Sequence, residues 1–388
     1  MPQIYKYSDP AAWVEIDINA IHHNFRELRK LAGRQLDRRV NPKVHLLSVV
    51  KADAYGHGML EVARAIEKEG GRFFAVSNLE EAVTLRLSGN KHRILLFEAT
   101  LPGLAAKIIK YGLTPTVCTL PFVQELDRAA KKAGKTVAVH VKIDTGMGRL
   151  GVWHLEASAF IKKIAKLSNI RIEGLMTHFP VAETDREFTE KQMIWFADVV
   201  ADLLKAGIPF TYLHAANSMG LGAYRNRIFN LVRPGVSLYG LYPDQSLRKK
   251  VKLIPVMSVK ARVLFVKTIR SGWGVSYGHT FRAKKTTPAA VISMGYSDGY
   301  LRAVSNRAHM LINGIPCPVR GRVTMDQTIV DISKAGRVRI GDEVVIIGRQ
   351  GKRVITADDL ADWAGTIHYE ITCSLGNRLP RFYTGRGL

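Results

Sequence analysis

Short apolar runs rich in β-branched residues alternate with segments of helical spacing over the first 240 residues, and this alternation constrains the fold most. Several of the helical segments end in glycine, for example Gly112, which tolerates the left-handed conformation that terminates helices. Eight such units predict a parallel (β/α)8 TIM barrel. A doubly wound sheet is the competing fold, but the glycine-rich phosphate turn that it usually needs after an early strand is absent. The predicted strands are Val44–Ala52, Phe73–Asn78, Arg93–Ala99, Leu113–Cys118, Thr136–Asp144, Ile170–Phe179, Phe210–Ser218 and Asn230–Gly240.

The composition changes after Pro243. Residues 256–347 contain β-branched runs separated by glycine, proline and asparagine, and beyond them only Thr356–Ala364 has helical spacing, with Thr356 as the predicted N-cap. We therefore expect an α/β fold with two domains, a barrel over residues 1–245 and a mainly β domain over 246–388. Residues 1–18 are candidates to pack with the β domain.

Composition excludes several classes of protein. No apolar run approaches the roughly 20 residues that cross a bilayer, and the N-terminus lacks the pattern of a secretory signal, so we expect a cytoplasmic protein without membrane contact. Three cysteines are too few for a disulfide framework, and no metal site is expected. The net charge is +24, and residues 246–388 hold 24 basic but only 9 acidic side chains. Because these basic residues are dispersed and no nucleic-acid motif accompanies them, a solvated basic surface is favoured over nucleic-acid binding.

The predicted strand ends carry chemically active residues, and barrel enzymes place their active sites there. Lys51 follows the first strand directly. A lysine at the end of a buried strand is partly desolvated, which lowers its pKa and favours imine chemistry. The alternative is a lysine whose amine extends to solvent at the barrel rim.

Further candidate residues, which would act through polar side chains or backbone amides, follow the later strands. Each has a structural alternative, as a core histidine, a helix cap or a turn. Taken together, these residues predict a lysine opposite a phosphate pocket, which is typical of a pyridoxal-phosphate site. The cationic Arg233 would keep the pyridine nitrogen of this cofactor unprotonated and suppress side reactions such as transamination. These residues are Arg149 after the fifth strand, His178 after the sixth, Asn217 and Ser218 after the seventh, and Arg233, Gly235 and Val236 after the eighth.

Nine motifs in this order resemble the alanine racemase family along essentially the whole chain. The resemblance implies a pyridoxal-phosphate barrel of fold type III, a C-terminal β domain and a homodimer with shared active sites. It also implies the interconversion of L-alanine and D-alanine by two bases, which supplies D-alanine for peptidoglycan in cell-wall biogenesis. The motifs are VVKADAYGHG, VKIDTGMGRLGV, MTHF, HAANS, RPGVSLYG, VSYGHTF, GYSDGYLR, GRVTMDQ and HYEITCSLGNRLPR.

By this resemblance, Lys51 binds the cofactor and accepts the proton of the D-enantiomer, while Tyr277 of the partner subunit is the base for L-alanine. Lys142 corresponds to a lysine that is carbamylated in some relatives and orients Arg149. The substrate-binding positions are Arg149, Met325 and Asp326. The cofactor-binding positions are Lys51, Tyr55, Arg149, His178, Asn217, Ser218, Arg233, Gly235, Val236 and Tyr369.

Three departures from the family pattern concern substrate breadth and access. Thr324 stands where many relatives have cysteine, Tyr300 where tryptophan is common near the substrate entrance, and the acidic entrance residue is either Glu183 or Asp185. A broader amino-acid racemase of the same fold is therefore the alternative function. A barrel decarboxylase is disfavoured by Arg233, and a non-catalytic cofactor carrier by the presence of the second domain and Tyr277.

Overall fold

The computed structural model describes residues 10–35, 44–223 and 229–385. Their contacts divide into two compact units. The barrel unit comprises Ala20–Ala54 and Met59–Pro255, and the β unit comprises residues 10–19, 55–58 and 256–385. This division falls ten residues after the domain boundary that we predicted from the sequence at residue 245, and that boundary stays a prediction. Among the described residues, no helix is both long and apolar enough to cross a membrane.

The barrel unit contains a parallel sheet that closes on itself. Seven strands pair in the order β3-β4-β5-β6-β7-β9-β10. An eighth strand, β11 (Leu231–Val232), pairs in parallel with β2 (His45–Leu46), which directly precedes β3. The amide of Arg233 donates to the carbonyl of Ala216 at 3.0 Å, which connects β11 to the segment after β10. A short strand, β8 (Val152–Trp153), pairs in parallel with the end of β7. The other strands are β3 (Ser48–Val49), β4 (Phe73–Val76), β5 (Arg93–Ala99), β6 (Thr114–Val117), β7 (Val137–Asp144), β9 (Ile170–Met176) and β10 (Tyr212–His214).

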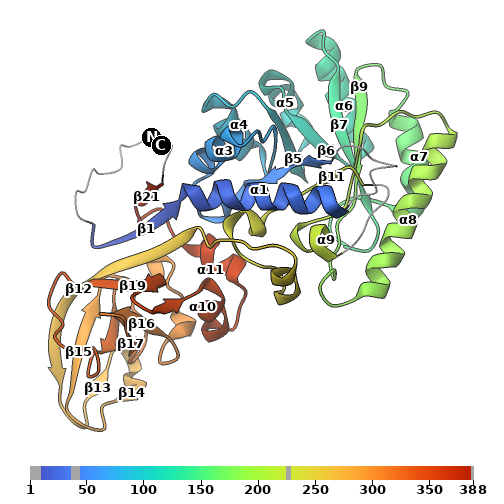
Figure 1. Cartoon of the computed structure of the whole chain (residues 1–388). Helices are drawn as coiled ribbons and strands as arrows, with labels where there is room; N and C mark the ends of the chain where they lie inside the picture. The colour runs from blue at the N-terminus through green and yellow to red at the C-terminus, as the bar shows by residue number, and fades with distance from the viewer. Residues whose placement is uncertain (1–9, 36–43, 224–228, 386–388) are drawn as a thin grey trace. The chain divides into compact units, whose positions relative to one another are not determined.

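Helices follow these strands in sequence, so the predicted (β/α)8 fold is confirmed (Figure 1). After β11 the connection is a short 3-10 helix, η2 (Val236–Tyr239), where we predicted strand up to Gly240. Pairing continues to Pro234, whose carbonyl accepts from the amide of Val49 at 3.0 Å, and it ends there because proline has no N–H group to donate. The helices are α1 (Ile18–Gln35), α2 (Lys51–Tyr55), α3 (Met59–Lys68), α4 (Leu79–Leu87), α5 (Ala105–Tyr111), α6 (Leu120–Lys132), α7 (His154–Ile164), α8 (Arg186–Lys205) and α9 (Ser218–Ala223).

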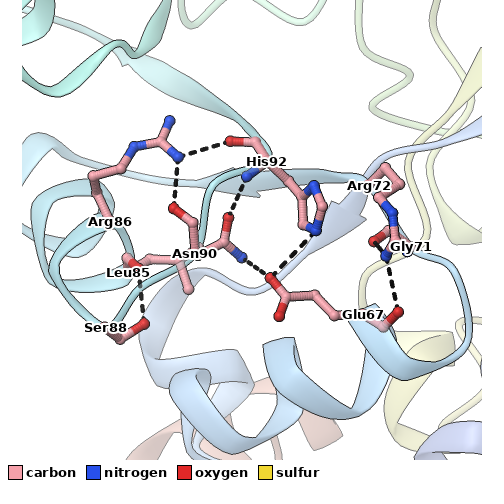
Figure 2. A network of polar contacts seen from close by, with 8 residues as sticks. All are labelled: Glu67, Gly71, Arg72, Leu85, Arg86, Ser88, Asn90 and His92. Carbon is pink, nitrogen blue, oxygen red and sulfur yellow. Dashed lines mark hydrogen bonds and ion pairs between the residues drawn. The ribbon is translucent and has the colours of Figure 1, made fainter.

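Arg86 on α4 joins several connections at the N-terminal ends of the strands. Its guanidinium donates to the carbonyls of Asn90 and His92, at 2.7 and 2.9 Å (Figure 2), and to those of Tyr111 and Gly112, at 2.9 and 3.0 Å. Gly112 is the predicted helix stop, and it ends α5 with a left-handed φ of 59°. One side chain thus donates to four backbone carbonyls in two connections.

The β unit is organised around the long strand β12 (Met257–Ile269), which runs antiparallel to β15 (Thr287–Ile292) and β19 (Glu343–Gln350) (Figure 1). β1 (Ala12–Asp17) pairs with β12 and with β21 (Arg381–Thr384), so residues from both ends of the chain belong to one sheet. Shorter strands complete the unit: β13 (Gly274–Val275), β14 (Phe281–Arg282), β16 (His309–Ile312), β17 (Ile315–Pro318), β18 (Thr328–Asp331) and β20 (Arg353–Ile355).

Two helices follow the strands of the β unit, whereas we predicted one. α10 (Ala357–Ala364) begins at the expected cap, where the Thr356 hydroxyl accepts from the amide of Asp359 at 3.0 Å. The expectation of a single helix was wrong, because α11 (His368–Ser374) is also helical. Its seven residues are mostly weak helix formers, and packing decides such short segments more than propensity does.

Candidate functional site

The candidate residues of the barrel unit lie after the C-terminal ends of its strands. Lys51 directly follows the segment of β3, Arg149 lies in the loop after β7, and His178 lies just after β9. The remaining ones follow the last two strands, with Asn217 and Ser218 after β10 and with Arg233, Gly235 and Val236 after β11. Because carboxyl ends of parallel strands meet at one end of a barrel, these side chains share one end of the unit.

The chain after Lys51 forms a left-handed turn. Ala52, Asp53, Ala54 and Tyr55 all have φ between 51° and 56°, a conformation that costs roughly 1–2 kcal/mol per non-glycine residue. The carboxylate of Glu81 accepts from the amide of Ala52 at 2.6 Å. Since four strained residues follow the candidate lysine, surrounding contacts must hold the turn in place.

The same turn is held at further points. The second carboxylate oxygen of Glu81 accepts from the amide of Ser77 at 2.8 Å, which fixes the carboxylate between two segments. Asp53 accepts from the amide of Met59 at 2.7 Å, at the start of α3. The backbone around Lys51 is therefore positioned by two acidic side chains that sequence analysis did not identify.

The loop that carries Arg149 is organised by Asp144 at the end of β7. One carboxylate oxygen accepts from the amides of Gly146 and Met147, both at 2.8 Å, and the other accepts from Gly148 at 3.0 Å. A Cβ at Gly151 would lie 2.7 Å from the backbone nitrogen of Asp144, so only glycine fits there. The role of Asp144 in holding this second loop was also not identified from the sequence, although an aspartate before Thr-Gly-Met-Gly is a turn signal.

Arg233 is 3% exposed, and its guanidinium lies among backbone carbonyls and histidine rings. Its Nη2 donates its two protons to the carbonyls of Thr177 and Ala215 at 2.9 and 2.8 Å, and it also lies 3.2 Å from Nδ1 of His178. Its Nη1 donates to Nδ1 of His214 at 3.0 Å. Burial lowers the pKa of Arg233 to about 9, which still leaves the guanidinium charged at neutral pH.

His178 is neutral in this environment. Burial and then the charge of Arg233 hold its pKa well below the ordinary value of 6.5. Because a guanidinium can only donate, Nδ1 of His178 must be the acceptor and Nε2 must carry the proton. His178 therefore offers an N–H donor from its second ring nitrogen.

Lys142 on β7 is 4% exposed, and its amine donates only a long hydrogen bond, 3.3 Å, to the carbonyl of Ile143 among the contacts described. Burial and the charge of Arg233 lower the pKa of Lys142 to about 7. A large fraction of this amine is therefore unprotonated, and hence nucleophilic, at neutral pH.

The turns after β10 and β11 meet at Ser218, which is 5% exposed. The Ser218 hydroxyl accepts from the amides of Gly235 and Ser237 at 3.0 and 3.4 Å, so its own proton can be donated to a ligand. Asn217 accepts from the amide of Gly220 at 2.8 Å and so caps α9, as its structural alternative proposed.

Five candidates belong to the β unit. The rings of Tyr55 and Tyr369 lie 6.2 Å apart, and burial, followed by the proximity of Tyr369, raises the pKa of Tyr55. Tyr277 is 71% exposed and Met325 is 53% exposed. Asp326 forms an ion pair with Arg378 at 2.9 Å.

The residues that depart from the family pattern differ from one another in burial and in hydrogen bonding. Tyr300 is 2% exposed and belongs to the core of the β unit. Asp185 caps α8 by accepting from the amide of Phe188 at 2.9 Å, whereas burial raises the pKa of Glu183. Thr324 donates from its hydroxyl to the carbonyl of Gln327 at 2.8 Å and stabilises a turn.

The fold and this end of the barrel define an enzyme with a closed (β/α)8 barrel, a lysine after its first strand and a buried cation after its last. Family models agree: that of the alanine racemase N-terminal domain matches residues 16–243, and that of the C-terminal domain matches residues 256–383. The chain belongs to the alanine racemase family.

Relatives and solved structures cover almost the whole chain. The alanine racemase of Halothermothrix orenii is 40% identical over 96% of this chain and 97% of its own length. The alanine racemase structure of Clostridium difficile 630 has a TM-score of 0.90 and 33% identity, covering 97% of both chains. That of Bartonella henselae with covalently bound pyridoxal phosphate has a TM-score of 0.85 and 29% identity, covering 97% of this chain and all of the other.

Proposed function

We propose that this enzyme interconverts L-alanine and D-alanine with pyridoxal phosphate as cofactor. The observation that carries the proposal is the arrangement of Lys51 and the buried Arg233 at one end of a barrel of this family. The experiment is incubation of the purified protein and pyridoxal phosphate with L-alanine, followed by chiral chromatography. Formation of D-alanine is expected, and its absence with a fully loaded protein would refute the proposal.

The residues present fit the cofactor. The Ser218 oxygen accepts from the amides of Gly235 and Ser237, so its own proton is left for a phosphate, and the Val236 amide is the proposed second donor, with Asn217 beside them. Arg233 supplies a cation for the pyridine nitrogen, and His178 is the candidate behind the ring. Tyr55 and Tyr369, neighbours in the β unit, are the proposed tyrosine ligands of the phosphate.

Two bases are proposed. When bound, pyridoxal phosphate acidifies the Cα–H bond of an amino acid. The amine of Lys51 takes the proton from one face of Cα, and the Tyr277 hydroxyl exchanges a proton on the other face. The Nε2–H of His178 is the candidate hydrogen-bond donor to the Tyr277 oxygen.

The substrate contacts are proposed for Arg149, Met325 and Asp326. Arg149 is exposed at the end of the loop that Asp144 organises, so its guanidinium is available for a carboxylate. Lys142 is the candidate for carbamylation: its neutral amine would add to CO2 and release one proton. The resulting anion would attract Arg149, whereas two cations repel each other.

The exposed side chains of Tyr277 and Met325 support the proposal that the enzyme is a homodimer whose active sites combine two subunits. We further propose a cytoplasmic role in supplying D-alanine for peptidoglycan. Alanine is favoured over a broader substrate range because the relatives reported above are named alanine racemases. Rates with lysine, arginine and serine in place of alanine test this choice.

A further inference from the structure

A continuous row of buried polar side chains crosses the interior of the barrel. From Arg233, the contacts run to Nδ1 of His214 at 3.0 Å and from its Nε2 to Nδ1 of His140 at 2.7 Å. The row ends where Nε2 of His140 lies 3.5 Å from a carboxylate oxygen of Glu173. All four side chains are at most 3% exposed. Barrel interiors are usually packed with branched apolar side chains, so this polar row demands a physical reason.

The chemistry of the four groups gives the row a single direction. The guanidinium of Arg233 only donates, so Nδ1 of His214 accepts and the proton of that ring is on Nε2. His214 therefore donates to Nδ1 of His140, and the proton of His140 is on Nε2, facing Glu173. A second proton on either ring would set two donors against each other, and burial lowers the pKa of both histidines.

Glu173 on β9 is fixed at the far end of the row. Its other oxygen accepts from Arg171 at 3.1 Å and forms an ion pair with Arg93 at 3.3 Å. Burial raises the pKa of Glu173, but the contacts with His140 and Arg93 outweigh it, and the net pKa is lowered. Arg93 and Arg171 lie at the starts of β5 and β9, at the barrel end opposite Lys51.

The backbone also makes room for the row. A Cβ on Gly174 would lie 2.6 Å from two atoms of the His140 ring, so this position must be glycine for the ring to keep its place. The pairing of β7 with β9 is irregular between Val139 and His140, directly beside this ring. Strand register and side-chain chemistry therefore both accommodate the imidazole.

We propose that Glu173 is a positioning residue for Arg233. Its carboxylate lies 3.5 Å from Nε2 of His140, so its negative charge favours the tautomer that places the proton of His140 on Nε2, and Arg233 then meets an acceptor on His214. Without Glu173, only the charge of Arg233 still favours these tautomers, and the opposite pair becomes populated. In that pair His214 presents an N–H to Arg233, and the guanidinium is displaced. The tautomers are independent of any reaction, whereas the consequence for catalysis rests on the proposed function.

Nitrogen NMR of the histidine side chains in the protein without cofactor tests the direction of the row. In the unmodified protein, His140 and His214 should each carry their only proton on Nε2. The variant Glu173→Leu should show a second population with the protons on Nδ1, while Glu173→Gln should show less of it, because an amide oxygen can still face Nε2 of His140. Leu175→Ala is the control for a cavity on the same strand and should keep the pattern. If Glu173→Leu does not fold, His140→Phe removes the row while filling similar volume.

Kinetics of the cofactor-loaded enzyme tests the role of the row. With Arg233 displaced, kcat of Glu173→Leu or His140→Phe should fall about tenfold, transamination should rise severalfold, and KM should change little. A protonated imidazole or an Nδ1–H tautomer in the unmodified protein would overturn the proposal. Unchanged tautomers, kcat and transamination in Glu173→Leu would overturn it as well. If the tautomers are as expected but the unmodified enzyme does not racemise alanine, the row stands and the proposed function fails.

Discussion

Arg233 in the barrel unit is 3% exposed and is hydrogen-bonded through both terminal nitrogens, whereas Tyr277 in the β unit is 71% exposed. Met325, a proposed substrate contact, is 53% exposed in the same β unit. The barrel residues are positioned by their own unit before any ligand binds. The β-unit residues are large, partly apolar and uncovered, which is typical of a surface that another surface completes.

This difference in exposure explains which kind of chemical group each unit can contribute to the proposed site. Burial desolvates charged groups and shifts their pKa values, so the barrel holds a charged arginine beside neutral imidazoles. An exposed phenol needs a partner surface before it meets a similar environment. The predictions below test how far the two units differ, from the largest effect to the smallest.

The largest effect concerns the two proposed bases. Lys51→Ala and Tyr277→Phe should each lose nearly all racemase activity, because each removes one base. If the site combines two subunits, mixing the two inactive variants creates dimers in which one site has both bases. Random reassortment of equal amounts should return about a quarter of the wild-type sites.

The activity of the mixture, with subunit exchange confirmed by mass spectrometry, checks this prediction. Each variant taken alone through the same dissociation and reassociation is the control. Exchange without recovered activity would mean that Tyr277 acts within its own chain, and the comparison between the two units would lose its functional meaning.

A second prediction concerns the left-handed turn after Lys51. Glu81→Ala removes the acceptor of the amides of Ala52 and Ser77, so we expect a stability loss of about 1–2 kcal/mol and a roughly tenfold lower kcat. Thermal unfolding and racemase kinetics measure both. Glu80→Ala, the exposed neighbour on the same helix, is the matched control and should change neither.

A third prediction concerns stability far from the site. Arg86→Ala leaves four backbone carbonyls without their donor, so we expect about 2–3 kcal/mol lower stability with unchanged kcat/KM. Denaturant unfolding checks the loss. Arg64→Ala, which breaks an exposed ion pair with Glu61, should cost well under 1 kcal/mol. Equal losses in the two variants would contradict the role of Arg86.

The smallest effect concerns Lys142. Its pKa is lowered from 10.5 to about 7 in the folded state, so the unfolded chain binds more protons between these values and stability should rise with pH across that window. In buffer free of CO2, Lys142→Met should therefore show a smaller rise in Tm than wild type between pH 7 and about 10.

Bicarbonate sharpens this test. A carbamate on Lys142 should add the mass of one CO2 to the intact protein and should be absent from Lys142→Met. An unmodified mass at neutral pH in bicarbonate would count against carbamylation, and equal Tm slopes for the two proteins would contradict the lowered pKa.

Strand positions could be predicted because their signals are local. The alternation of apolar runs and helical segments depends on neighbouring residues, and all eight expected runs contain barrel strands. The candidates after strand ends, such as His178 and Arg233, followed from the same pattern. Motif resemblance then added Tyr277, Met325 and Asp326, which no local period identifies.

Other features depend on contacts between residues far apart in the chain. The short helix α11 and the pairing of β1 with β21 were not predicted, because packing and sheet formation outweigh weak local propensities. Glu81 is 29 residues from the amide of Ala52 that it accepts from, so only the folded chain brings them together.

By itself, the sequence determined the barrel, the β region and the residue types at the strand ends, since periodicity and motifs are written along the chain. Only the tertiary structure decided the directional row from Arg233 to Glu173 and the left-handed turn after Lys51. Both depend on donors meeting acceptors from distant strands and helices. Hydrogen-bond direction and strain arise from three-dimensional contact, and no pattern along the sequence encodes them.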